Sequence, residues 1–181
     1  MLALTSGVIL WSVAHLFKRV APGPRSAMGS AGRAVMAVLI LASIYLMAVG
    51  YQPAMGTFFW GRNPMLVGIN NLLVLLAVYL MVASTVKPAI VAKIRHPQLT
   101  AVKAWAVGHL LVNGDAASFI LFGGLLAWAV ASVIIINKQD GKPELVSTSG
   151  AGKEVMTVVI TLVVFGGIAW VHNYLGYPVF G

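Results

Sequence analysis

The residues best suited to chemistry in this chain are histidines set in apolar sequence. His109 lies in the run RHPQLTAVKAWAVGHLLVNGD, from Arg95 to Asp115, and His96 stands at the start of the same run. The sequence around His109 is apolar enough to cross a lipid bilayer, and an ionisable side chain at membrane depth marks a functional site by default. The chain has 4 histidines, so His109 is the first candidate for a functional residue.

His15 is the second candidate, near the end of an earlier apolar run. Side chains in a helix tilt toward its N-terminus. His15 and His109 are expected on antiparallel helices, at opposite ends, so this tilt points both imidazoles toward the membrane centre. A haem held between two histidines would suit that arrangement. Trp11 shares a helix face with His15. Trp105 and Asn113 share a face with His109, so both sets are expected to line a flat cofactor pocket.

Each histidine also has a structural alternative. His15 could be an interfacial residue that reaches water, and His109 could form a hydrogen bond between helices, worth about 1 kcal/mol. His96 could anchor the membrane interface or help to hold an anionic group such as a haem propionate. His172, at the end of the last apolar run, could be a surface residue or an alternative iron ligand.

The elements that must position these residues are membrane-spanning helices. Of the 181 residues, 60% are hydrophobic and 9% are charged, whereas a soluble domain carries about 25% charged residues. Apolar runs recur along the whole length, so we expect one all-α domain over residues 1–181, a polytopic membrane helix bundle. Because a helix needs about 20 residues to span, six segments predict six transmembrane helices: Leu2–Phe17, Ala34–Gly50, Pro64–Val86, Gln98–Val112, Ala116–Ile136 and Val155–His172.

The basic residues predict the orientation of this bundle. All but one of the 12 Lys and Arg residues fall in or beside the loops after the first, third and fifth segments. Arg62 alone falls on the opposite side. Because cytoplasmic loops collect Lys and Arg, both termini should face the periplasm. The same asymmetry explains the net charge of +8 without a nucleic-acid partner, and makes membrane lipid the expected surrounding. On the inner side, Arg19, Arg95 and His96 are candidates for holding propionates, from depth alone.

Short polar motifs predict where helices begin and end. Asn63 precedes a proline and predicts an N-cap, and Asp115, after a tight turn, predicts another. The polar run Asn137–Lys153 predicts a flexible cytoplasmic linker without chemistry. Asn70 and Asn71 are polar at depth and should point to the interior of the bundle.

Other chemistries find little support in the sequence. The 4 acidic residues all lie at or beyond predicted helix ends, which argues against a carboxylate proton relay, and no catalytic residue can be assigned. The number of cysteines is 0, which excludes thiolate ligands and covalent haem attachment. Any haem must therefore be held non-covalently.

Three runs of sequence resemble a known family. HPQLTAVKAWAVGHLLVNGD, followed by ASFILFGGLLAWAV, resembles the signature of the NnrU family of bacterial membrane proteins. The early AHLFKRVAPGPR and the ending HNYLGYPVFG resemble other parts of that family, so the resemblance covers essentially the whole chain. It implies a multi-pass protein of the bacterial inner membrane, linked to denitrification and nitric oxide metabolism.

NnrU proteins are similar to zeta-carotene isomerase, a membrane enzyme that carries haem b and converts a cis double bond of a carotenoid to trans. The resemblance implies that His15 and His109 bind haem b between the first and fourth helices. It also implies a redox or isomerase-type activity, with a carotenoid or another apolar substrate, or a redox partner. The alternative is a non-enzymatic accessory or assembly protein whose histidines only bridge helices. The sequence leaves open whether the chain is an enzyme.

Overall fold

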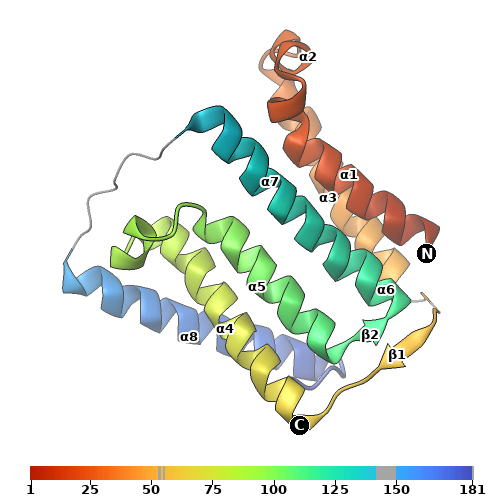
Figure 1. Ribbon diagram of the computed structural model, residues 1–181, viewed down its shortest axis with the longest axis vertical. Helices are drawn as coiled ribbons and strands as arrows, with labels where there is room; N and C mark the ends of the chain where they lie inside the picture. The colour runs from red at the N-terminus through yellow and green to blue at the C-terminus, as the bar shows by residue number, and fades with distance from the viewer. Residues whose placement is uncertain (53, 55, 142–149, 181) are drawn as a thin grey trace.

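The structure, a computed structural model, describes residues 1–52, 54, 56–141 and 150–180. Long helical segments in this part of the chain run alternately between the two ends of a bundle (Figure 1). They are α1 (Leu2–Val20), α3 (Ala31–Tyr51), α4 (Pro64–Val86), α5 (Pro97–Val112), the continuous α6 (Ala116–Ser118), η2 (Phe119–Gly123) and α7 (Gly124–Asp140), and α8 (Ala151–Tyr174). Short elements connect them: α2 (Pro22–Ala27), η1 (Ala89–Ala92), and strands β1 (Phe58–Trp60) and β2 (Gly114–Asp115).

Four of these segments are long and apolar enough to cross a membrane: Ala31–Tyr51, Pro64–Val86, Ala116–Asp140 and Ala151–Tyr174. Apolar side chains project from them, and Val163 and Trp170 of α8 are 70% and 68% exposed, as contact with lipid requires. The chain is therefore a helical membrane protein. α1 and α5 are not in this set. The 16 residues of α5 reach only about 24 Å, short of the roughly 30 Å of a hydrocarbon core.

Local signals fix the helix ends. The side chain of Asn63 accepts a hydrogen bond from the backbone N–H of Leu66 at 2.9 Å, and begins α4. Asp115 accepts bonds from the backbone N–H and the hydroxyl of Ser118 at 2.9 and 2.7 Å, and begins α6. Both predicted caps are confirmed. The sequence does not predict the small antiparallel sheet, in which β2 pairs with β1 and Trp60 lies opposite Gly114.

The helices pack in a defined lateral order. α1 packs against α3 and α7, α5 packs against α7 and α4, and α8 packs against α4. Figure 1 accordingly shows α7 between α1 and α5. Two clusters form the core. One joins α1, α3 and the α6–α7 segment through Leu4, Val8, Met47, Ala117 and Leu125, and the other joins α4 and α5 through Ala77, Leu80 and Ala101.

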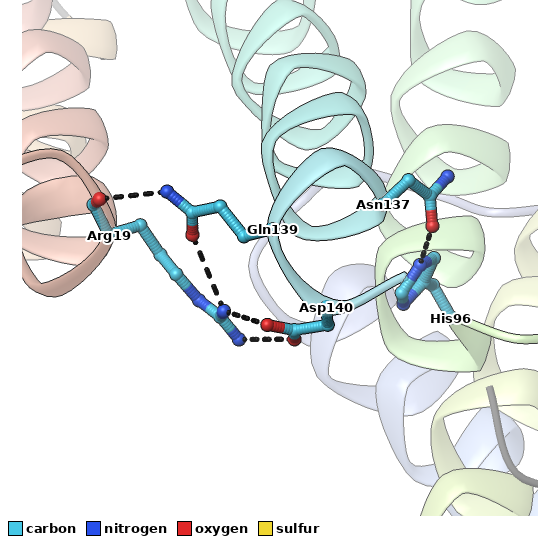
Figure 2. A network of polar contacts seen from close by, with 5 residues as sticks. All are labelled: Arg19, His96, Asn137, Gln139 and Asp140. Atoms are coloured by element: carbon cyan, nitrogen blue, oxygen red, sulfur yellow. Dashed lines mark hydrogen bonds and ion pairs between the residues drawn. The ribbon is translucent and has the colours of Figure 1, made fainter. Parts of the chain in front are cut away.

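The predicted linker Asn137–Lys153 is wrong at its two ends. α7 continues to Asp140 and α8 begins at Ala151, while residues 142–149 lie outside the described residues. Figure 2 shows the polar contacts at this end of α7. The Arg19 guanidinium donates to both carboxylate oxygens of Asp140 at 2.6 and 2.9 Å. Asn137 Oδ1 lies 2.9 Å from His96 Nε2. These bonds hold the end of α7 to α1 on one side and to the start of α5 on the other.

A candidate cofactor cavity lined by two histidines

A cavity of about 530 Å³ lies between α4, α5, α8 and the C-terminal segment. Ligand pockets typically occupy about 300–1,000 Å³. One face of each helix contributes to the wall. The lining residues are Asn70, Asn71, Val74, Ala77, Val78, Met81 and Val82 of α4; Ala101, Val102, Trp105, His109 and Val112 of α5; Val164, Phe165, Ile168, Ala169 and His172 of α8; and Tyr51, Arg62, Asn113, Phe122, Tyr177, Pro178 and Val179 from adjoining segments.

His109 and His172 are the two histidines in this wall. The Nδ1 atom of His109 lies 3.0 Å from the carbonyl oxygen of Trp105, four residues earlier on the same helix. His172 Nδ1 lies 2.9 Å from the carbonyl oxygen of Ile168, also four residues earlier. Because a carbonyl oxygen only accepts, each Nδ1 donates its proton to it, and the neutral form of such a ring keeps its lone pair on Nε2. Metal-binding histidines are commonly fixed in this way, with the second ring nitrogen donating to a backbone carbonyl.

Aromatic rings support His109 from the side. The ring centroids of Trp105 and Phe122 lie 5.0 and 4.7 Å from that of His109, and 5.0 Å from each other. Phe122 sits in η2, a π-helical turn, and such turns occur frequently at functional sites. Asn113 Nδ2 donates to the carbonyl oxygen of His109 at 2.9 Å. The structure therefore brings Trp105, His109 and Asn113 together, as the sequence predicts, and adds Phe122.

The predicted pairing of His15 with His109 is not found in this cavity, because His15 and Trp11 are not among its lining residues. The His15 ring instead lies 4.0 Å from the ring of Trp11 and 5.0 Å from that of Trp128, measured between centroids. The pairing assumes that α1 and α5 are neighbours, and α7 lies between them. A common depth in the membrane does not fix lateral position.

His96 is also outside the cavity. It precedes α5 at the opposite end of that helix from His109, and its Nε2 contacts Asn137. His96 therefore joins the start of α5 to the end of α7, and its predicted role as an anchor at the membrane interface stays a prediction.

Polar side chains gather at one end of the cavity, beside the C-terminal segment. Among its described lining residues, Arg62 is the one with a permanent charge. Arg62 Nη2 donates to the carbonyl oxygen of Pro178 at 2.7 Å, and Asn71 Nδ2 donates to that of Val179 at 3.1 Å. Asn70 Nδ2 donates to Asn71 Oδ1 at 3.2 Å, while the buried Oδ1 atom of Asn70 has no hydrogen-bond partner. We call this the polar end of the cavity.

Sequence reasoning does not place Arg62 or Phe122 in the cavity, and it names His172 only as an alternative iron ligand. Arg62 enters the sequence argument only as the exception to the charge asymmetry. Its isolation is the signal that could have found it, because a lone arginine on the side poor in basic residues has no role in setting orientation.

The donor set bears on which metal group could bind. Within the described ranges, no cluster of three or more His, Cys, Asp or Glu could hold a metal ion. A haem needs fewer ligands from the protein, because the porphyrin itself binds the iron and the protein supplies only the axial ligands. The two cavity histidines, the apolar and aromatic wall and the arginine at one end fit such a group.

The fold and the cavity define a class: a helical membrane protein with a largely apolar cavity and two available imidazoles. The NnrU protein family matches residues 3–179, so the chain belongs to that family. The match includes every segment that contributes to the cavity. A search of curated proteins and a search of solved structures each found no match.

Proposed function

We propose that this NnrU-family protein binds haem b non-covalently in the cavity, where the Nε2 atoms of His109 and His172 would hold it. The observation that carries the proposal is the hydrogen-bonding arrangement that the rings of His109 and His172 share. Each lines the same cavity, and each has Nδ1 bound to its own helix, which leaves Nε2 for a ligand. Haem b supplies a one-electron redox centre when it is bound. Trp105 and Phe122 offer flat apolar surfaces for a porphyrin.

The proposal includes a multi-pass orientation in the bacterial inner membrane with six crossings. The alternating direction of the long helical segments supports it, together with the basic residues gathered at one end of the bundle. With that end in the cytoplasm, both termini lie in the periplasm. Arg62 and the polar end of the cavity then lie toward the periplasmic side.

A redox role fits the two imidazoles best, because electron transfer through such a site requires no change of ligand. We therefore propose a function in redox support of nitric oxide metabolism and denitrification, with a membrane or periplasmic redox partner. Isomerase-type chemistry on a carotenoid or another apolar substrate would need His109 or His172 to release the bound group, so that the substrate could reach it.

The alternative, an accessory protein whose histidines only bridge helices, has less support. His15, His109 and His172 each bond to a carbonyl oxygen of their own helix. Among the described histidines, His96 is the one with a hydrogen bond that joins two helical segments.

Absorption spectra test the proposal. The protein is expressed with haem supply, purified in detergent, and measured oxidised and reduced as wild type, His109→Ala, His172→Ala and, as a matched control, His15→Ala. We expect a Soret band in wild type, a shifted or lost band in the first two variants, and an unchanged band in the control. A wild type without a Soret band would overturn the proposal and favour the accessory role. Loss of the band in His15→Ala alone would move the ligand role to His15.

Carbon monoxide separates the two kinds of activity. We expect no shift of the Soret band when carbon monoxide is added to the reduced wild type, because His109 and His172 would both hold the bound group. A clear shift would replace the redox role with a site that opens to a substrate.

A further inference from the structure

We infer that Arg62 fixes the orientation of the bound group by binding its carboxylates at the polar end of the cavity. The inference rests on the proposed function, because it concerns the two propionates of the haem. It also reverses the sequence-based expectation that the propionates lie at the basic end of the bundle.

The first step is the polarity of the cavity along its length. The α4 lining runs from Asn70 to Val82, which corresponds to roughly 18 Å of helix at about 1.5 Å per residue. Its start carries two amides, whereas Met81 and Val82 at its far end are apolar. On the antiparallel α5, Asn113 lies just beyond one end of the helix and Val102 near the other. A ligand with one charged edge and one apolar edge therefore fits in one direction.

The second step is the state of the Arg62 side chain. An arginine has five N–H donors, and the bond to Pro178 uses one of them. The ion pair found among the described residues is the one between Arg19 and Asp140. Within that part of the chain, Arg62 therefore has no carboxylate partner. Asp115, the acidic residue at this end, is occupied by two hydrogen bonds from Ser118. A planar guanidinium with several donors left can hold a carboxylate through two parallel hydrogen bonds.

The third step is the position of the other cations. Arg19, Arg95 and His96 are not among the residues that line the cavity. Arg19 is paired with Asp140, and His96 contacts Asn137, as Figure 2 shows. The three side chains that the sequence suggests for the propionates, from predicted membrane depth alone, are thus outside the cavity. Arg62 lies in its wall.

A neutral analogue of the ligand tests this inference. Protein produced without haem supply is titrated with haem b and with its dimethyl ester, in which both carboxylates are uncharged. We expect wild type to bind haem about ten-fold more tightly than the ester, as the loss of a charge-assisted hydrogen bond implies. Arg62→Gln should lose most of this preference, and Arg62→Lys should keep part of it. Arg33→Gln, at an exposed arginine outside the cavity, is the matched control.

Three outcomes are decisive. Equal affinity of wild type for haem and ester, or an Arg62→Gln variant that weakens both equally, overturns the inference and leaves haem binding intact. No binding of either ligand to wild type overturns the proposed function together with the inference. A preference that is lost in Arg62→Gln and retained in Arg33→Gln supports the inference, and partial recovery in Arg62→Lys excludes misfolding as the cause.

Discussion

At the residue scale, the same local bond occurs in histidines of different surroundings. His15, His109 and His172 all place Nδ1 within 3.0 Å of the carbonyl oxygen four residues earlier. An imidazole N–H in an apolar helix needs an acceptor, because an unsatisfied polar group away from water costs free energy. The contact is therefore a general solution for a histidine in an apolar helix. It prepares Nε2 for a ligand only where a cavity adjoins the ring, as it does at His109 and His172.

Glycines show residue-scale constraints that can be tested directly. A Cβ atom added at Gly50 of α3 would meet the backbone nitrogen of Leu4 in α1, whereas one added at Gly68 of α4 would meet no atom within 4 Å. We expect Gly50→Ala to lower the free energy of unfolding by about 1–3 kcal/mol, as overpacking does. Gly68→Ala should leave it unchanged or raise it by about 0.5–1 kcal/mol, because alanine favours helix. Reversible unfolding in mixed detergent measures both, and equal effects would contradict the close approach of α1 and α3.

At the element scale, α8 depends on a narrow contact. It packs against α4, and its buried residues are Thr157 and Thr161, whose hydroxyls bond to carbonyl oxygens of α8 itself at 2.7 Å. The sequence predicts this helix from hydropathy, with limits close to those observed. It does not predict that His172 shares a cavity with His109, because every side of α8 is apolar and the pattern names no neighbour.

Enlarging the buried face of α8 should separate it from α4. Thr157 is 0% exposed, so Thr157→Leu adds volume to a closed interface and should lower the free energy of unfolding by about 1–3 kcal/mol. The haem that we propose should also dissociate more readily from this variant, because α8 carries His172. Val163→Leu adds volume on the same helix at a side chain that is 70% exposed, and should have little effect. If the two variants behave alike, α8 is not held by the Thr157 contact.

At the scale of the whole molecule, the sequence predicts elements and directions better than neighbours. The segment Pro64–Val86 is predicted with its observed limits, and the caps at Asn63 and Asp115 follow from local chemistry. The lateral order of the helices has no such signal. Lipid is as apolar as a helix interface, so hydropathy does not distinguish the side of α1 that packs on α7 from a side in contact with lipid. That gap explains why sequence reasoning places His15 opposite His109, whereas in the structure His172 is the histidine that lines the same cavity as His109.

The side of the membrane on which each loop lies tests the six crossings. α1 and α5 are the two helices outside the set that is long and apolar enough to span. The chain has 0 cysteines, so single substitutions report without background. If all six segments cross, Leu2→Cys and Thr57→Cys should react with a membrane-impermeant maleimide in intact cells with a permeabilised outer membrane. Ser26→Cys, Lys93→Cys and Lys138→Cys should react only after the inner membrane is opened.

The two short helices give separate signatures in that experiment. If α5 did not cross, α7 would carry residue 138 to the side opposite residue 93, and Lys138→Cys would label in intact cells. If α1 did not cross, Leu2→Cys would share the protection of Ser26→Cys. We expect neither result. α5 lies between α4 and α7, both in the set long enough to span, and local thinning of the bilayer can accommodate a helix of 16 residues at a modest cost. His109 then lies at membrane depth because its neighbours hold it there, despite the shortness of its own helix.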